Sequence, residues 1–232
     1  MYHVDLVEDG MLVGQLALKQ SACLVWAKAI PSSVAITTHT ETNEATTSLT
    51  DNAVANYISA IYAEHYGANI RVHYPKLFSI RNQQGDILAA VGFRAADDQP
   101  LFLEQYIDTP IEDKINTPRR QIVEIGNLAS DSKGATLLLF TALSAYLDFQ
   151  GFTHAVVTST STLKKRLMSL GLEPQFLASA NPDLLLHKNE CWGSYYDTQP
   201  QVLVGSVTKA NQKLKHVLNA TYDDMQPLVA TL

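Results

Sequence analysis

The segment from Arg119 to Gly171 constrains the fold more than any other part of this 232-residue chain. It contains an apolar strand at residues 121–129, a capped helix that ends at Gly151, a second strand at residues 153–158 and a second helix. A strand, helix, strand connection of this length almost always forms a right-handed crossover between parallel neighbours. We therefore expect the two strands to lie side by side in parallel.

The rest of the chain predicts a mixed α/β (α+β) fold, in which helices flank a central sheet. Apolar spacing predicts a helix at residues 51–66 and strands at residues 34–37, 76–81, 87–93, 101–107, 191–197 and 201–207. Three units are expected: an N-terminal extension or extra strands (1–31), the main domain (32–208), and a C-terminal segment with room for a short helix, packed on the same domain (209–232).

The charge of the chain excludes several classes of partner. The 17 Lys and Arg residues and 23 Asp and Glu residues give a net charge of −6, without a long basic run. We therefore expect neither nucleic acid binding nor an electrostatic hold on anionic lipid. No apolar run approaches the roughly 20 residues of a membrane helix, and the N-terminus lacks a basic signal segment. These features predict a cytoplasmic protein without a transmembrane segment.

Several common motifs are missing. The two cysteines, Cys23 and Cys191, form neither a metal pattern nor a disulfide framework, and the seven histidines are scattered, so no metal is expected. The chain has no Walker motif and no Rossmann fingerprint, which leaves little support for a nucleoside triphosphate or NAD. A serine hydrolase is a distant hypothesis, because no G-x-S-x-G elbow is present.

Glu124 is the single acid in an otherwise apolar strand, and strand alternation places it on one face with Ile122 and Gly126. An unpaired buried carboxylate is costly, so Arg119 or Arg120 is one candidate partner. The alternative is functional: desolvation raises the pKa of Glu124 and makes it a general base, or the carboxylate binds a substrate ammonium. Gly126 indicates either a bulge or the close approach of a ligand.

The loop that follows this strand opens a helix. The first N–H groups of a helix have no intrahelical partner, so the backbone from Lys133 to Thr136 is expected to offer donors at the positive end of the helix dipole. Ser132 and Lys133 would add a hydroxyl and a cation. This arrangement suits a phosphate group. The alternative is that Ser130 or Ser132 only caps the helix.

The order of these elements resembles the GNAT acyltransferase fold. Residues 123–128 and 156–171 are most similar to its acyl-homoserine-lactone synthase branch. A closer resemblance, to the thermostable hemolysin family, covers about residues 33–207. Its segments are Tyr62-Ala-Glu-His-Tyr-Gly-Ala68, Leu101-Phe-Leu-Glu-Gln-Tyr-Ile-Asp108, Ile122-Val-Glu-Ile-Gly-Asn-Leu-Ala129 and Trp192-Gly-Ser-Tyr-Tyr-Asp197.

The resemblance implies transfer of a fatty acyl group from a thioester of CoA or acyl carrier protein to a small-molecule amine. Glu124 would orient or deprotonate the amine, and a backbone N–H near Asn127 or Leu128 would polarise the thioester carbonyl. Five residues of the helix-opening turn would hold the phosphate of the donor: Ser132, Lys133, Gly134, Ala135 and Thr136.

Three further pairs of residues become candidates through the same resemblance. Tyr195 or Tyr196 would protonate the leaving thiolate, although a tyrosine pair is also typical of edge packing. Glu104 and Gln105, expected on a neighbouring strand, would contact the acceptor head group. Thr158 and Thr160 would line an acyl channel, or else simply cap the next helix.

The turn departs from the usual GNAT pattern, which has Gln or Arg at its start and Gly or Ala at its end. Here Asp131 and Thr136 occupy those ends. The departure argues against CoA and moves the expected donor towards acyl carrier protein.

The family name implies lysis of red cells, which leaves two alternatives to catalysis: a hemolysin that perturbs membranes directly, or a non-catalytic ligand-binding relative. Lysis by an acylated amphiphilic product would reconcile the name with an enzyme. The sequence does not distinguish a monomer from a homodimer.

Overall fold

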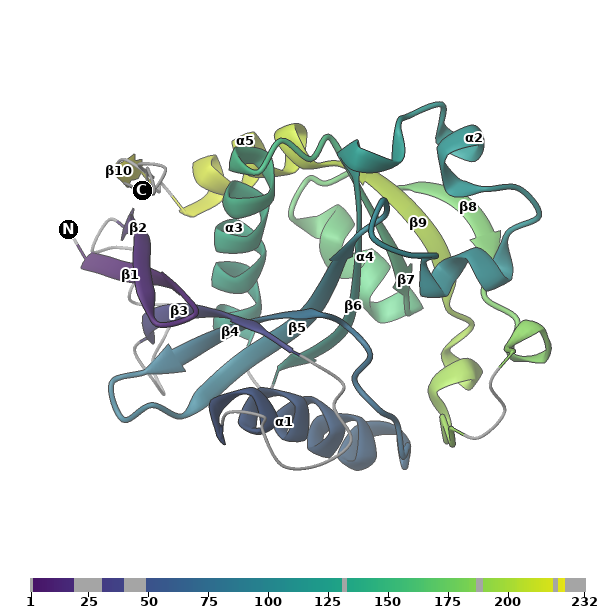
Figure 1. The fold of residues 1–232 in the computed structure, drawn as a ribbon, viewed down its shortest axis with the longest axis horizontal. Coiled ribbons are helices and arrows are strands. Elements are labelled where there is room, and N and C mark those ends of the chain that lie inside the picture. The colour runs from purple at the N-terminus through teal and green to yellow at the C-terminus, as the bar shows by residue number, and fades with distance from the viewer. Residues whose placement is uncertain are drawn as a thin grey trace.

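The computed structural model describes residues 2–18, 31–39, 49–130, 133–186, 190–218 and 221–223. They form a mixed sheet in the order β10-β2-β1-β3-β4-β5-β6-β7-β9-β8 (Figure 1). The strands are β1 (Tyr2–Glu8), β2 (Met11–Leu18), β3 (Pro31–Thr38), β4 (Lys76–Asn82), β5 (Ile87–Ala95), β6 (Ile122–Ser130), β7 (His154–Ser159), β8 (Gln175–Ser179), β9 (Gln201–Ser206) and β10 (Thr221–Asp223). The expected mixed sheet with flanking helices is confirmed.

The sheet is antiparallel except at two places. β1 pairs with β3 in parallel, and β6 pairs with β7 in parallel. The second pair confirms the crossover predicted from the sequence, since helix α3 connects its strands. The strands of the N-terminal segment extend the same sheet, because β1 lies against β3.

Helices cover both faces of the sheet (Figure 1). They are α1 (Leu49–Tyr66), α2 (Ile111–Ile115), α3 (Lys133–Phe149), α4 (Ser161–Ser169) and α5 (Val207–Leu218). Helix α1 packs on β4, β5 and β6 from one face, and α3 packs on the other face beside α5. No helix in the described part of the chain is both long and apolar enough to cross a membrane.

Strand alternation divides the core between these two faces. Phe78 and Val91 face α3 and pack with Leu138 of that helix. Leu77 and Ala90, their neighbours in sequence, face α1 instead. Both faces of the central strands are therefore buried, which explains their continuous apolar sequence.

Two expected strands are 3₁₀ helices in the structure: η2 (Phe102–Tyr106) and η5 (Tyr195–Thr198). At η2, the Glu104 carboxylate accepts the N–H of Leu101, and Glu124 accepts the N–H groups of Phe102 and Leu103. These backbone N–H groups thus donate to side-chain carboxylates, and they are no longer available to pair with a neighbouring strand. The tyrosines of η5 pack against Trp192, which a 3₁₀ spacing permits and an alternating strand does not.

Other elements also differ from the sequence prediction. Helix α2 and strand β8 were not predicted from the sequence. Two further 3₁₀ turns occur, η3 (Arg119–Gln121) and η4 (Pro182–Leu184). The polar, Pro-containing sequences around these elements give no apolar period by which to recognise them.

Strand β6 loses one of its neighbours halfway along. It pairs with β7 only from Ile122 to Ile125, but with β5 as far as Ser130. Beyond Ile125 the register with β5 shifts, and Asn127 has a φ of 53°. This is a β-bulge, and bulges bend and twist the strand that contains them. The two parallel strands therefore separate at this point.

The side chain of Tyr74 explains Gly126. A Cβ at Gly126 would overlap the Tyr74 hydroxyl, and one at Gly92, its partner on β5, would lie 2.5 Å from the ring. The close approach anticipated at Gly126 is thus made by a tyrosine of the chain itself. The bulge, the other alternative, begins one residue later.

We expect Gly126→Ala to lower the free energy of unfolding by about 1–3 kcal/mol, because the new methyl group must displace the buried ring. Urea denaturation measures the change. Gly205→Ala is a matched control in β9, since nothing lies within 4 Å of its added Cβ. Combining Gly126→Ala with Tyr74→Ala should recover part of the loss; strictly additive effects would show that the ring is not the cause.

Candidate functional site

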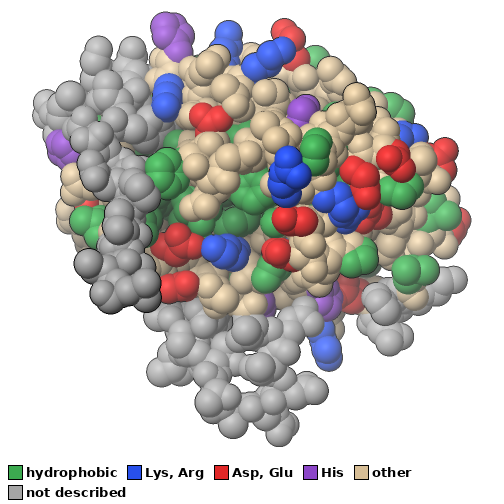
Figure 2. Space-filling model, turned by 45° about the horizontal axis from the view of Figure 1, so that its top comes forward, with side chains coloured by type: hydrophobic (Ala, Val, Ile, Leu, Met, Phe, Trp, Pro, Cys, Tyr) green, Lys and Arg blue, Asp and Glu red, His purple; other side chains and the backbone are tan. Residues whose placement is uncertain are grey.

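A cavity of about 1010 Å³ lies where β6 and β7 separate. Its lining comes from both faces of the sheet: from α1 and η5 on one side, and from α3, α4 and α5 on the other. Figure 2 shows one face of the molecule, on which acidic and basic side chains are interspersed. The cavity passes between β6 and β7 at the point where the two strands separate.

The wall on the α1 side, which we call the aromatic wall, consists of Tyr62, Tyr66, Phe102, Tyr106, Trp192, Tyr195 and Tyr196. Neighbouring ring centroids in this wall are 5.3 to 6.5 Å apart. Packed rings of this kind form a rigid surface with few rotatable bonds. Such a surface suits a ligand held in one orientation.

Tyr195 and Tyr196 both reach the cavity, with different hydrogen bonds. The Tyr195 hydroxyl donates to the carbonyl of Thr158 (3.4 Å), and the hydroxyls of Tyr196 and Tyr106 are 2.5 Å apart. Burial raises the pKa of both Tyr195 and Tyr196 above the usual value of 10.0. Both side chains therefore keep their protons at neutral pH, and each hydroxyl is able to donate a hydrogen bond.

The opposite wall is hydrophobic and mainly aliphatic, and we call it the apolar wall. It consists of Phe140, Leu143, Leu147, Val157, Leu163, Leu167 and Leu214. These residues come from α3, β7, α4 and α5. A hydrocarbon chain is the ligand that such a lining favours.

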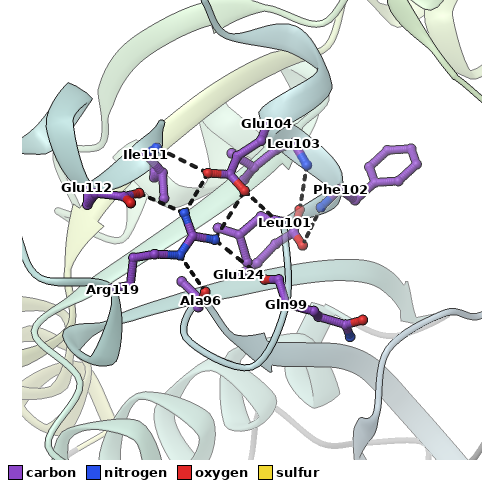
Figure 3. Close-up of polar contacts among 10 residues, drawn as sticks. All are labelled: Ala96, Gln99, Leu101, Phe102, Leu103, Glu104, Ile111, Glu112, Arg119 and Glu124. Carbon is purple, nitrogen blue, oxygen red and sulfur yellow. Dashed lines mark hydrogen bonds and ion pairs between the residues drawn. The ribbon is translucent and has the colours of Figure 1, made fainter. Parts of the chain in front are cut away.

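Glu124 lies beside the cavity and not at its surface. Its side chain is 1% exposed. The N–H of Leu103 donates to Oε1 (2.8 Å) and that of Phe102 to Oε2 (3.0 Å), as Figure 3 shows. The Nε atom of Arg94 is 3.4 Å from Oε2. Desolvation by burial raises the pKa of Glu124 to about 7, against the opposing effects of Arg94 and the two N–H groups.

The charged partner of Glu124 is Arg94, which corrects the expectation that Arg119 or Arg120 fills this role. Arg119 binds two other carboxylates, since Nη1 lies 2.7 Å from both Glu104 Oε1 and Glu112 Oε2 (Figure 3). Burial raises the pKa of Glu104, but the hydrogen bonds from Arg119, Leu101 and Ile111 outweigh it, and the pKa is lowered overall. This second carboxylate is therefore a fixed anion.

The structure does not bring Glu104 and Gln105 to the cavity. Glu104 occupies the cluster around Arg119, and Gln105 donates to the carbonyl of Phe102 (3.0 Å) and accepts the N–H of Leu186 (2.8 Å). Both lie on η2 rather than on a strand. Their polar atoms hold neighbouring segments of the backbone together.

Other predicted residues do line the cavity: Asn127, Leu128, Thr136, Thr158 and Thr160. Thr160 also caps α4, because its hydroxyl accepts the N–H of Leu163 (3.2 Å). The Oγ1 atom of Thr158 is buried and has no hydrogen-bond partner in the described part of the chain.

The expected phosphate turn is described only in part. Gly134 and Ala135 are buried in the first turn of α3, and the Thr136 hydroxyl donates to that of Ser130 (2.9 Å). Ser132 and the side chain of Lys133 lie outside the described residues. Among the residues that are described, no group of three His, Cys, Asp or Glu side chains gathers as metal ligands.

The sequence analysis missed Arg94 and Tyr74, both of which line the cavity. Arg94 is the single cation in the apolar strand β5, so the criterion that identified Glu124 would also have identified it. Tyr74 has a weaker signal, the two strand glycines Gly92 and Gly126. Glycine in a strand indicates close approach of another group, but not which one.

Replacing Glu124 should change how stability depends on pH. Its pKa of about 7 in the folded protein exceeds the ordinary glutamate value of 4.5. Its protonated form therefore stabilises the fold fully below pH 4.5, and this contribution is lost as the pH rises through 7. We expect the unfolding free energy of Glu124→Gln, minus that of the wild type, to increase by up to about 3 kcal/mol from pH 5 to pH 8. A difference that stays constant across this range, measured by urea denaturation, would contradict the raised pKa.

Comparison with known proteins agrees with this geometry. No curated protein matches the chain in sequence. The solved structure of TofI, in a ternary complex with an inhibitor and MTA, has 11% identity and a TM-score of 0.53, covering 78% of this chain and 96% of that chain. BjaI, a CoA-dependent acyl-homoserine lactone synthase solved with SAM and isopentyl-CoA, has 10% identity, a TM-score of 0.50, and coverage of 74% and 84%.

FeeM, an N-acyl amino acid synthase from uncultured soil microbes, has 12% identity, a TM-score of 0.50, and coverage of 79% and 96%. These similarities confirm the expected GNAT-like fold. The family model described as "Thermostable hemolysin" matches residues 44–211. The chain therefore belongs to the thermostable hemolysin family.

Proposed function

We propose that this protein is an N-acyltransferase, which moves a fatty acyl group from a CoA or acyl-carrier-protein thioester to the amine of a small molecule or amino acid. The main support is the cavity itself, because it joins an aromatic wall beside Glu124 to an apolar wall through the opening between β6 and β7. Proteins of the same fold, BjaI and FeeM, are acyl-transferring synthases.

The thioester lies across the opening between the two strands. Beyond Ile125, β6 has no strand partner on the β7 side among the described residues. A backbone N–H at Asn127 or Leu128 there polarises the thioester carbonyl and stabilises the oxyanion that forms. The donor phosphate lies at the start of α3, held by backbone N–H groups at the positive end of the helix dipole. Ser132, which precedes this helix in the sequence, adds its hydroxyl.

The acyl chain lies against the apolar wall, between α3 and α4. Each methylene moved there from water contributes about 0.8 kcal/mol. Thr158 and Thr160 lie at the entrance to this compartment, on the end of β7 and the start of α4. A large hydrophobic lining of this kind favours a fatty chain over an acetyl group.

The amine enters from the aromatic wall and attacks the thioester carbonyl carbon. A C–N bond forms, the C–S bond breaks, and the N–H proton passes to Glu124. Because Glu124 lies behind Arg94 and Phe102, this proton travels through one water molecule. Tyr196 donates a hydrogen bond to the departing sulfur, which solvent then protonates. The acceptor site excludes Glu104 and Gln105, whose polar atoms hold the backbone.

We expect Glu124→Gln to lower the turnover number by at least about 10²-fold, the scale of losing a general base. Release of free thiol from dodecanoyl-CoA or dodecanoyl acyl carrier protein, mixed with candidate amines, measures it. Glu112→Gln is the control, because Glu112 also pairs with an arginine but lies outside the cavity.

Equal activity of Glu124→Gln and the wild type would remove Glu124 from the mechanism. Absence of thiol release with every donor and amine, together with leakage of liposomes by the same protein, would favour direct membrane perturbation. Tight thioester binding without turnover would favour a non-catalytic relative.

Leu167→Trp should shift the preferred donor to shorter acyl chains, because the larger side chain fills the apolar wall. Rates of thiol release across a C4 to C16 acyl series test this. Met168→Trp is the matched control: it is the next residue of α4, its side chain is 58% exposed, and it does not line the cavity. An unchanged chain-length profile in Leu167→Trp would place the acyl chain elsewhere.

A further inference from the structure

Arg94 presents a guanidinium group to the cavity with most of its donors unused. The side chain is 8% exposed and lies over the ring of Tyr74, 4.7 Å from the centroid. Its Nη2 atom donates to the carbonyl of His73 (2.8 Å). Its Nε atom is buried without a hydrogen bond. In the described part of the chain, the bond to His73 is the one hydrogen bond that Arg94 makes.

Glu124 does not satisfy this cation. Its two oxygens already accept the N–H groups of Leu103 and Phe102, and its 3.4 Å contact with Arg94 Nε does not meet hydrogen-bond geometry. Burial also raises the pKa of Glu124 to about 7, which weakens it as a counter-ion near neutral pH. A buried cation that is only partly compensated is costly. The unused donors of Arg94 therefore suit an anionic ligand.

The position of Arg94 identifies which part of the reaction it serves. Arg94 lies on the same face of the sheet as Tyr74, whereas its neighbour Phe93 packs against α3 on the opposite face. The donor phosphate at the start of α3 is thus on the other side of the sheet. An anion bound by Arg94 comes from the acceptor, beside the aromatic wall.

We propose that Arg94 binds the carboxylate of the acceptor, which makes the acceptor an α-amino acid rather than a simple amine. A guanidinium edge matches a carboxylate with two parallel hydrogen bonds. Arg94 and Glu124 are cross-strand neighbours, so a carboxylate bound by Arg94 keeps the amine of an α-amino acid, which is one carbon away, close to Glu124. This inference rests on the proposed N-acyl transfer and specifies its acceptor.

The test compares matched acceptors: phenylalanine with phenethylamine and phenylalaninamide, and leucine with isopentylamine and leucinamide. We expect kcat/KM for each free amino acid to exceed that of its two analogues by at least about 10²-fold, since loss of the carboxylate leaves Arg94 unpaired. If amines and amides react as well as the amino acids, the carboxylate assignment is wrong while acyl transfer stands.

Variants separate recognition from catalysis. In Arg94→Gln, kcat/KM for the amino acid should fall to within about threefold of kcat/KM for the matching amine. Most of this change should come from a lower kcat/KM for the amino acid. Glu124→Gln should lower both rates and leave the ratio unchanged. An undiminished ratio in folded Arg94→Gln would overturn the proposal. If that variant does not fold, the wild-type acceptor series decides.

If no acceptor releases thiol, the proposed function fails, and binding then tests Arg94 separately. N-dodecanoyl-phenylalanine should raise the melting temperature of the wild type more than its amide does, and this difference should vanish in Arg94→Gln. Equal shifts with the acid and the amide would show that no carboxylate site exists.

Discussion

Strand β6 has a neighbour on both edges only as far as Ile125, and the remainder of the structure is arranged around this constraint. A buried backbone must find hydrogen-bond partners for its N–H and C=O groups. Beyond Ile125 the edge of β6 that paired with β7 faces the cavity. The other edge continues to pair with β5 on both sides of the bulge at Asn127. The same feature that interrupts the sheet therefore directs backbone groups of β6 towards the cavity.

Tyr74 connects the stability of the sheet to the chemistry of the cavity. Its ring packs against Gly92 and Gly126, where a side chain larger than hydrogen would overlap it. The guanidinium of Arg94 lies over the face of the same ring. An aromatic face attracts a cation and also removes it from water. A residue that packs the sheet thus sets the position and the solvation of a charged group that lines the cavity.

The sequence predicted features that depend on local chain order and missed those that depend on strand register. The parallel pair of β6 and β7 follows from one strand, helix, strand segment. Glu124 was found because a lone acid stands out in an apolar strand. Its partner was sought nearby, at Arg119, yet Arg94 faces it across an antiparallel pairing that only the register reveals. Segment η2 was misread because its apolar residues alternate, and the carboxylates that bend it come from side-chain contacts.

Two carboxylates near η2 show how the geometry of an arginine decides what an acid can do. Glu104 and Glu124 each accept backbone N–H groups, and each has an arginine beside it. Arg119 meets Glu104 with hydrogen bonds at 2.7 and 3.1 Å, and the pKa of Glu104 falls. Arg94 approaches Glu124 without such a bond, and burial raises the pKa of Glu124 to about 7. Two acids whose environments give them different pKa values are suited to different roles. Glu104 is a fixed anion that holds the fold together, whereas Glu124 can exchange a proton at neutral pH.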